Sequence, residues 1–544
     1  MIIKTTSAKS QIYFILLLVL VLFSLYFGTI RYGLVNFDDN QLISEQYSFL
    51  SNKANIIQAF TQDVFKGNNI FHEHKSYYRP ILTISFIADV LLFKNNYKIF
   101  HVTNICYHCI ASVLLFLFLI RNNIYPRYSF LLTLIFAVHP ILNQAVAWIP
   151  GRNDILLAIF VLASFISIDM YLKSKRIVSL FFHILFVALA LFTKENAMFI
   201  FPLLCIYIYV RRQSITIKNS FYYVLGLLYF TITVLWFILR QKALEGSVDS
   251  ISIPFMVSNF IKNFPFIFQY IGKIMFPYNL SVMCTVKDTN YFIAIIIIIL
   301  FLYILYRAKA QNKKYMLGGI LWFFLFLLPS LIAPEYGGME HRVYLPLIGI
   351  VFIAGILLSY DFSKQIARYI SVCLIPIIVL FYYLSYIRLP IFSSSKDFWG
   401  SAIETSNYSS KGFLYQGKNF ENEGDYKKAI SLYEMGIERD STERMLFNNA
   451  GSAYLAIGNY DKAEYYLQKE IKYHADNPFP YMNLGIIYEN KKEYIIATEY
   501  YKKAISINPH ANSLPYEGLC DYYTKTGDSI LYRYYFTLKK KYFK

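Results

Sequence analysis

Polar residues that could do chemistry occupy short loops between long apolar segments of this 544-residue chain. Two adjacent carboxylates, Asp38 and Asp39, follow the first apolar segment. Neighbouring carboxylates raise each other's pKa, so one of them could act as a general base toward a hydroxyl group. The pair could equally form an Asx turn or cap the helix expected from Gln41 onward. The residues alone leave both interpretations open.

Candidate anion-binding residues lie in the same loop and in three later ones. Arg79 stands beside aromatic residues in Tyr77-Tyr78-Arg79-Pro80, which suits a phosphate clamp and also a membrane-interface anchor. Arg152 and Asp154 flank a turn and could pair, or Arg152 could bind an anion. The later loops add five candidates: Lys194, Glu195, Glu340, His341 and Arg342.

Two short motifs raise the question of a metal or redox site. His72-Glu73-His74 offers two imidazoles, but no third ligand follows at helical spacing. Cys106 and Cys109 lie in an apolar helical run and lack a second cysteine pair, so ordinary helix packing is the favoured interpretation. The sequence therefore predicts no metal ligands and no required cofactor. Whether a divalent metal ion takes part in the reaction stays open.

The elements that position these loops are expected to be membrane-spanning helices. Hydrophobic residues make up 56% of the chain and charged residues 16%, against about 25% charged in soluble domains. Segments 81–93 and 254–280 are ambiguous and could lie at the membrane interface. Eleven apolar runs have about the length that crosses a bilayer: 11–30, 97–120, 128–148, 154–172, 177–193, 196–210, 220–239, 290–306, 315–333, 342–360 and 369–387.

The charge distribution indicates how these helices are oriented. Residues 389–544 hold 20 basic and 19 acidic side chains, so +17 of the net charge of +18 belongs to the apolar part. Placing the basic loops in the cytoplasm puts the N-terminus there and the C-terminus outside. All acidic residues before 389 except Asp169 and Asp361 then lie on the outer side, which favours chemistry on that face. The neutral C-terminal part excludes nucleic-acid binding.

The C-terminal part repeats with a period of 34 residues. Gly417, Gly451 and Gly485 are 34 apart, and alanines recur at the same interval. This pattern resembles the tetratricopeptide repeat, a pair of antiparallel helices whose stacks bind peptide segments. We expect a membrane domain over 1–388, a linker with a degenerate half-repeat over 389–410, three repeats over 411–512 and capping helices over 513–544.

The chain as a whole resembles the multi-spanning GT-C glycosyltransferases, in particular the transmembrane and tetratricopeptide-repeat O-mannosyltransferases and their bacterial relatives. Members of that group follow the acidic pair after the first span with further motifs. In this sequence those motifs are Tyr78-Arg79-Pro80, His101-Val102-Thr103-Asn104, Phe136-Ala137-Val138-His139-Pro140, Gly151-Arg152-Asn153-Asp154, Lys194-Glu195 and Glu340-His341-Arg342-Val343-Tyr344-Leu345-Pro346.

The resemblance implies transfer of a sugar, mannose in the named family, from a polyprenyl-phosphate carrier to Ser or Thr hydroxyls of proteins. Asp38 or Asp39 would be the base in an inverting attack. Arg79, Arg152, Lys194 and Arg342 would hold the departing phosphate. The repeats would bind the acceptor or a partner protein.

The sequence thus predicts an all-α protein, a polytopic GT-C-like membrane domain of about eleven spans followed by a tetratricopeptide-repeat solenoid. The expected location is a bacterial inner membrane with periplasmic repeats, or an ER membrane and lumen in a eukaryote. Two alternatives remain. One is a transferase of the same fold that modifies lipid or surface polysaccharide, and the other is a membrane scaffold for an envelope complex.

Overall fold

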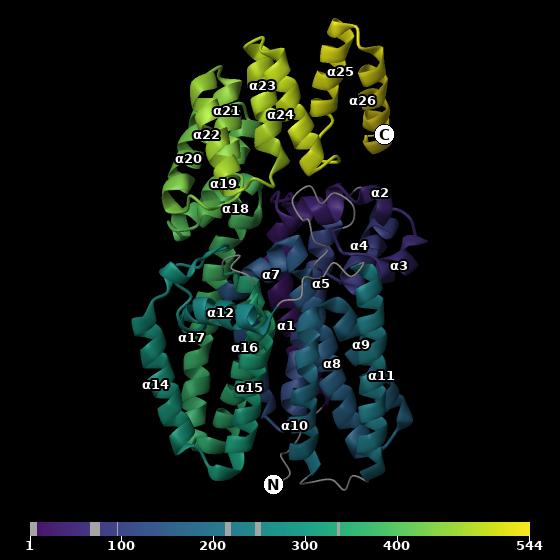
Figure 1. The fold of residues 1–544 in the computed structure, drawn as a ribbon. Helices are drawn as coiled ribbons and strands as arrows, with labels where there is room; N and C mark the ends of the chain where they lie inside the picture. Colours follow the sequence, from purple (N-terminus) through teal and green to yellow (C-terminus); the bar gives the residue numbers. More distant parts are fainter. Residues whose placement is uncertain are drawn as a thin grey trace. The chain divides into compact units, whose positions relative to one another are not determined.

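The computed structural model describes residues 8–65, 77–94, 96–212, 219–244, 252–333 and 338–543. The chain divides into two compact units, Met1–Phe398 and Trp399–Lys544. Helices form both units (Figure 1), and the one extended pairing in the described ranges is an isolated bridge between Cys284 and Gly338. The predicted all-α class, with an apolar helical domain and a C-terminal repeat region, is confirmed.

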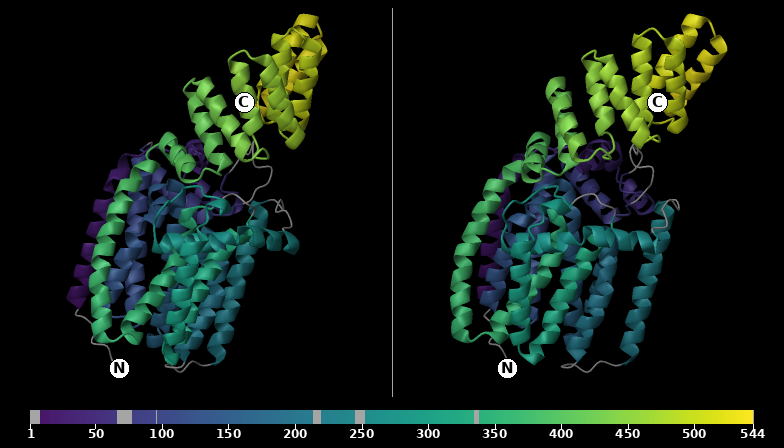
Figure 2. Two further views of the ribbon diagram at one scale, coloured as in Figure 1. Left: turned by 90° about the vertical axis from the view of Figure 1, so that its left-hand side faces the viewer. Right: turned by 60° about the vertical axis from the view of Figure 1, so that its left-hand side comes forward.

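The first unit is a bundle of long apolar helices, and its α1 and α17 lie side by side (Figure 2), joined by Ser24 and Tyr382, whose hydroxyls are 3.1 Å apart. Its helices are α1 (Ala8–Tyr26), α2 (Tyr47–Leu50), α3 (Asn55–Gln58), α4 (Pro80–Phe93), α5 (Lys98–Arg121), α6 (Pro126–Ala137), α7 (Asn143–Ala147), α8 (Arg152–Ser174), α9 (Ile177–Thr193), α10 (Ile200–Arg212), α11 (Asn219–Ala243), α12 (Ile253–Asn263), α13 (Pro265–Met275), α14 (Tyr291–Arg307), α15 (Ala310–Ile332), α16 (Tyr344–Ile356) and α17 (Lys364–Arg388).

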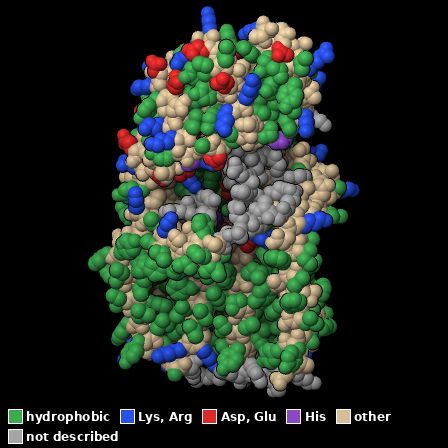
Figure 3. Space-filling view, viewed as in Figure 1, with side chains coloured by type: hydrophobic (Ala, Val, Ile, Leu, Met, Phe, Trp, Pro, Cys, Tyr) green, Lys and Arg blue, Asp and Glu red, His purple; other side chains and the backbone are tan. Residues whose placement is uncertain are grey.

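Seven helical segments in the described ranges are long and apolar enough to cross a membrane, which identifies a multi-pass membrane protein. The bent pair α6 and α7 forms an eighth candidate, with a bend of 51°. Apolar side chains cover the visible face of this bundle (Figure 3). The seven segments are Lys9–Arg31, Lys98–Arg121, Ile149–Ser174, Asn219–Ala243, Asn312–Ile332, Glu340–Asp361 and Lys364–Phe392.

The expected count of eleven spans therefore differs from the structure, although each expected span contains helix. The bend falls at His139-Pro140, where proline lacks the amide hydrogen that a continuous helix needs. Helices α9 and α14 have 17 residues, at the lower limit of a crossing, and α10 with 13 residues falls short of one. Apolar composition in the sequence gives no measure of where each helix ends.

Two helical segments lie outside these spans, at the end of the bundle where the site is found. Helix α4 has 14 residues and buries most of one side against the unit. Segment 254–280 forms α12 and α13, each 11 residues long and separated at Phe264-Pro265. The side-chain amide of Asn259 on α12 donates to the backbone carbonyl of Ile332, the last residue of α15. The side-chain amide of Asn263 donates to the backbone carbonyls of Leu331 and Ala333. Helix α12 therefore caps α15 and does not cross the bilayer.

The second unit consists of helices that pair in chain order. Glycines set the close approach within these pairs, because a Cβ atom at Gly417 would lie 2.4 Å from the Tyr433 ring and one at Gly485 would lie 2.3 Å from the Tyr501 ring. The helices that follow the boundary helix α18 (Ser395–Thr405) are α19 (Ser410–Asn422), α20 (Tyr426–Arg439), α21 (Leu446–Ala456), α22 (Tyr460–Tyr473), α23 (Pro478–Asn490), α24 (Tyr494–Ile507), α25 (Leu514–Thr526) and α26 (Ser529–Tyr542).

Candidate functional site

The structure gathers several predicted site residues into one charged cluster at an end of the first unit. Lys194 follows the last residue of α9 and donates a 2.7 Å hydrogen bond from Nζ to Oδ1 of Asp154 in the first turn of α8. Its Nζ also donates to Asn153 Oδ1 at 3.2 Å. His341 Nε2 lies 3.9 Å from the other oxygen of Asp154. Because these side chains are buried, their charges act on one another with little screening.

A second ion pair borders this cluster. The Nε of Arg79 donates to Oε2 of Glu195 at 3.4 Å, and the guanidinium lies 4.5 Å from the centroid of the Tyr77 ring. Glu195 also accepts a hydrogen bond from the backbone N–H of Tyr78 at 3.2 Å. Arg79 keeps 15% of its side chain exposed and Glu195 keeps 26%. This pair can therefore meet a ligand at the surface of the cluster.

The electrostatics of the cluster favour an anionic ligand. Burial lowers the pKa of Lys194, the Asp154 carboxylate opposes that change, and the nearby charges of Arg79 and Arg342 lower the pKa further. The basic groups of Arg79, Lys194 and Arg342 thus lie close enough to act on one another. Such a group of basic side chains can hold a phosphate.

Two buried polar atoms in the cluster have no hydrogen-bond partner among the described residues. They are Oδ2 of Asp154 and Nδ1 of His341. Buried polar atoms in proteins are nearly always hydrogen-bonded, so such atoms call for a ligand or water. The cluster therefore offers a ligand two free hydrogen-bonding atoms in addition to its basic side chains.

The loop that carries the acidic pair is linked to this cluster by aromatic rings. The Phe37 ring stacks on the Trp148 ring at a centroid distance of 6.0 Å, and the Trp148 ring lies 5.3 Å from the His341 ring. Asp39 is buried, whereas Asp38 is half-exposed. The two carboxylates therefore have different environments, which their adjacency in the sequence does not reveal.

Asp39 shapes the loop that carries the pair. Its carboxylate accepts hydrogen bonds from the backbone N–H groups of Val35 at 2.5 Å and Phe37 at 2.9 Å. Asn36 between them has a φ of 53°. Burial raises the pKa of Asp39, and these N–H groups oppose that rise. The carboxylate bonds backward in the chain, so the helix cap predicted as an alternative is not formed by Asp39.

The Asp39→Asn variant is expected to lose about 1–3 kcal/mol of unfolding free energy. An asparagine side chain has one acceptor oxygen, so one of the two N–H groups would be left buried without a partner. The shift of the thermal midpoint of the detergent-solubilised full chain measures this loss. Glu45→Gln, an exposed carboxylate in the same loop, is the control and should leave the midpoint unchanged. Equal midpoints for Asp39→Asn and the wild type would contradict the role given to Asp39.

Arg152 lies in a separate buried network, which corrects its predicted role as a phosphate ligand. The side chain is fully buried and forms a 2.7 Å ion pair with Asp89 of α4. Its guanidinium also donates to Asn104, Ser85 and Thr103 and to the backbone carbonyl of Phe100. The expected alternative pairing with Asp154 does not form. With its donors engaged, Arg152 joins α4, α5 and α8 and has no donor left for a substrate.

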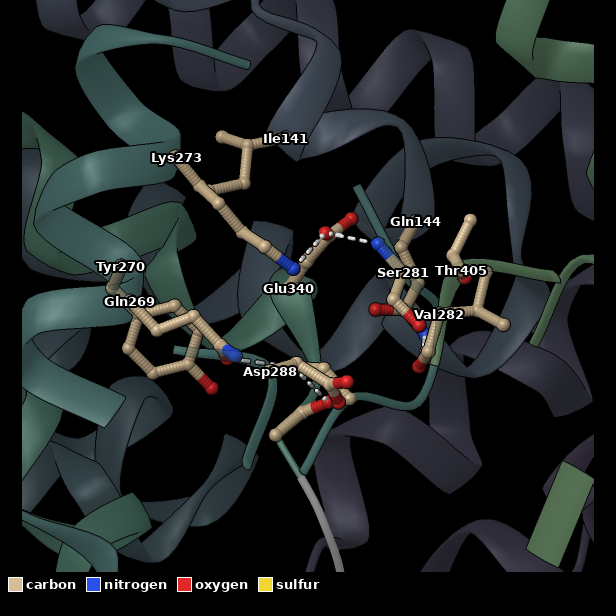
Figure 4. A network of polar contacts seen from close by, with 12 residues as sticks. Ile141, Gln144, Gln269, Tyr270, Lys273, Ser281, Val282, Asp288, Glu340 and Thr405 are labelled. Atoms are coloured by element: carbon tan, nitrogen blue, oxygen red, sulfur yellow. Dashed lines mark hydrogen bonds and ion pairs between the residues drawn. The ribbon is translucent and has the colours of Figure 1, made fainter. Parts of the chain in front are cut away.

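Glu340 is likewise part of a separate buried network (Figure 4). Its Oε1 accepts from Lys273 Nζ at 3.2 Å and from the backbone N–H of Ser281 at 2.6 Å. Its Oε2 accepts from Arg388 at 2.6 Å. The prediction that Glu340 binds substrate is therefore replaced by a positioning role. It fixes the short helix Glu340–Val343, which carries His341 and Arg342.

Three residues of these networks were missed by sequence reasoning: Asp89, Lys273 and Arg388. Each had a visible signal, because each is a lone charge in an apolar segment or at its end. Such charges are costly in a membrane protein unless they are paired. Their partners lie far away in the chain, so the sequence could not identify the pairs.

The motifs considered for metal binding do not enter the site. Residues 72–74 lie outside the described ranges. Cys106 and Cys109 lie on α5, and neither forms a disulfide. Within the part of the chain that the structure describes, no group of three or more His, Cys, Asp or Glu residues is arranged to hold a metal ion.

The sequence of this chain is similar to those of several known proteins. A tetratricopeptide-repeat family matches residues 480–510. "Protein O-mannosyl-transferase F38B6.6" of Caenorhabditis elegans is 25% identical over 426 residues, which cover 74% of this chain and 59% of that protein. "Protein O-mannosyl-transferase TMTC3" of Homo sapiens is 23% identical over 537 residues, which cover 91% of this chain and 55% of that protein. Over 209 residues, TMTC3 of Mus musculus is 31% identical, covering 37% of this chain and 22% of that protein.

The chain spans little more than half the length of the worm and human relatives. Among solved structures, the crystal structure of MamA is 23% identical and covers 27% of this chain and 85% of that one, at a TM-score of 0.25. The sequence similarity to the first two relatives extends over most of this chain. The three curated relatives described above are named protein O-mannosyl-transferases, and the resemblance of this chain to that tetratricopeptide-repeat-bearing family is confirmed.

Proposed function

We propose that the chain transfers a sugar, mannose by analogy with the relatives' names, from a polyprenyl-phosphate carrier to Ser or Thr hydroxyls of proteins. The observation that carries the proposal is the gathering of Arg79, buried Lys194 and Arg342 around the unpartnered polar atoms of Asp154 and His341, linked through aromatic rings to the loop of the acidic pair. This reaction requires basic groups that bind the leaving phosphate and a carboxylate base that takes the proton of the acceptor hydroxyl.

In the proposed reaction Asp38 acts as the base. Its carboxylate takes the proton of the acceptor hydroxyl while the hydroxyl oxygen forms a bond to the anomeric carbon. The bond from that carbon to the phosphate oxygen breaks, and the polyprenyl phosphate leaves with the electron pair. The attack from the opposite face inverts the anomeric centre. Arg79, Lys194 and Arg342 stabilise the negative charge that gathers on the leaving phosphate.

Asp38 is chosen over Asp39 because of its greater exposure. Asp39 is buried, and each of its two oxygens already accepts a hydrogen bond from a backbone N–H group. Asp38 is half-exposed in the same loop. A base must reach the proton it removes, and the exposed member of the pair can do so.

The membrane location and the repeats suit the same reaction. A carrier with a polyprenyl chain is held by the bilayer, and the reacting phosphate then lies at the membrane surface. We place the acidic pair and the repeats on the non-cytoplasmic side, because the basic loops lie at the opposite end of the helices. A repeat solenoid can bind an extended segment of the acceptor protein or a partner protein.

A complementation experiment tests this function. The gene is deleted in the source organism and restored as wild type, Asp38→Asn or the control Glu45→Gln. Immunoblots first establish equal amounts of each protein in the membrane fraction. Mass spectrometry should find glycopeptides that disappear on deletion, return with the wild type and the control, and stay absent with Asp38→Asn. A deletion strain with unchanged glycopeptides but altered surface polysaccharide would contradict a protein acceptor.

The lowered pKa of Lys194 leads to an expected pH dependence. The ammonium is charged below its pKa, so it should lose its charge at a lower pH than an ordinary lysine does, and phosphate binding should weaken there. The KM for the lipid-linked donor should therefore rise on the alkaline side, below the ordinary lysine pKa of about 10.4. In Lys194→Arg, whose guanidinium stays charged, this rise should vanish. The same alkaline rise in Lys194→Arg would contradict the assignment.

A further inference from the structure

The end of the bundle remote from the site contains a groove among five helices, α5, α8, α10, α15 and α16. Its cavity volume is about 50 Å³, and the groove is partly open to the outside. Apolar and aromatic side chains form most of its wall, including Phe118, Phe165, Leu203, Trp322 and Phe352. Four of the five helices lie in segments long and apolar enough to cross a membrane. The groove therefore lies among helices that contact lipid.

The polar residues of the groove collect near its basic end. Asn122, Arg211 and Lys314 lie where α5 and α10 end and where α15 begins. A bilayer lipid has the same distribution, with long apolar chains joined to a polar head. The groove has no comparable polar lining along the rest of its wall.

Several cations gather around one buried carboxylate at the basic end. Buried Asp169 pairs with Lys173 at 2.8 Å, with Arg211 at 3.1 Å and with Arg121 at 3.6 Å. One carboxylate thus faces three cations, and Lys314 adds a fourth cation to the groove wall. Lys and Arg side chains are also visible along this edge of the unit (Figure 3). Basic pockets between membrane helices bind anionic lipid head groups.

Two neighbouring glycines of α15 have different roles at the groove. A Cβ atom at Gly319 would lie 2.6 Å from Ile353 and 2.8 Å from the backbone oxygen of Gly349, so Gly319 permits close packing against α16. A Cβ atom at Gly318 would meet nothing within 4 Å, although Gly318 lines the groove. A side chain at Gly318 could therefore occupy the groove without disturbing the contact between α15 and α16.

We propose that this groove binds one anionic phospholipid, with an acyl chain along the aromatic wall and the phosphate beside Arg211 and Lys314. The lipid surroundings of the helices supply the apolar part of this occupant, and the positive end selects the charge of its head. On the orientation proposed above, the lipid belongs to the cytoplasmic leaflet. The site is separate from the sugar-transfer site and does not rest on the proposed activity.

The test compares Gly318→Leu with Gly226→Leu in the purified full chain. Gly226 lies on α11, and a Cβ atom there also meets nothing within 4 Å, so it is a matched control. Both changes replace a helical glycine by a better helix former, so neither should prevent folding. Thermal midpoints in detergent are measured with added phosphatidylglycerol or phosphatidylcholine, and retained lipid is counted by native mass spectrometry.

Phosphatidylglycerol should raise the midpoint of the wild type and of Gly226→Leu more than phosphatidylcholine does, and one phosphatidylglycerol should be retained. Gly318→Leu should lose both effects. Lys314→Gln should keep the lipid chain site but bind phosphatidylglycerol about fivefold more weakly. Equal effects of the two lipids on the wild type would overturn the proposal, as would full retention of the phosphatidylglycerol effect in Gly318→Leu.

Discussion

Replacing Asp38 with asparagine is expected to lower the rate of sugar transfer by about 10²–10⁴-fold, the usual contribution of a general base. An amide cannot take the proton of the acceptor hydroxyl, while the size of the side chain is nearly unchanged. The fall should appear in kcat, with little change in the KM for the donor, because the cations that hold the phosphate remain. Initial rates of the purified chain with a lipid-linked sugar and an acceptor peptide measure both constants.

Two variants in the same loop serve as controls for the effect of Asp38→Asn on the rate of transfer. Glu45→Gln removes an exposed carboxylate and should keep the wild-type rate. Asp39→Asn should lose stability first, because Asp39 holds the backbone N–H groups of Val35 and Phe37. If Asp39→Asn folds normally and loses all transfer while Asp38→Asn stays active, the assignment of the two carboxylates is reversed.

Replacing Arg152 with glutamine is expected to lower the free energy of unfolding by about 3–5 kcal/mol, as breaking a buried ion pair from one side typically does. Asp89, with 4% of its side chain exposed, would lose its partner at 2.7 Å. The carbonyl of Phe100 and the oxygen of Asn104 would also lose a donor. The thermal midpoint of the solubilised chain should fall accordingly.

Arg127→Gln is the matched control for Arg152, because Arg127 is exposed at the start of α6. It should leave the midpoint unchanged. The double variant Asp89→Asn with Arg152→Gln should regain part of the loss, because it removes both charges. A stable Arg152→Gln protein that binds the lipid-linked donor much more weakly would contradict the structural role and restore Arg152 as a phosphate ligand.

The sequence predicts the helical architecture well because apolar length and repeat spacing are local properties. Each of the eleven expected spans contains helix, and the glycine period of 34 residues corresponds to successive helix pairs. The exact number of crossings is not confirmed, because the break at His139-Pro140 and the ends of α9, α10 and α14 depend on tertiary packing. Hydropathy alone cannot separate a short buried helix from a full crossing.

The site was predictable as a set of loops on one face but not as a set of contacts. Lys194 and Asp154 pair across α8 and α9, two helices adjacent in the chain, so their meeting follows from a hairpin. Arg152 and Glu340 were grouped with the ligands because charge in an apolar chain suggests function. Their actual partners, Asp89 and Arg388, lie on other helices. Side-chain direction on a helix, which separates Arg152 from Asp154, is fixed only by the folded packing.

The most direct test of the central claim is transfer by the purified full chain in proteoliposomes. A polyprenyl-phosphate mannose with labelled sugar is supplied with Ser- and Thr-containing peptides, and labelled peptide is measured over time. The wild type and Glu45→Gln are expected to label peptide at equal rates, and Asp38→Asn to fall by at least about 100-fold with an unchanged thermal midpoint. Labelling by folded Asp38→Asn at the wild-type rate would contradict the account.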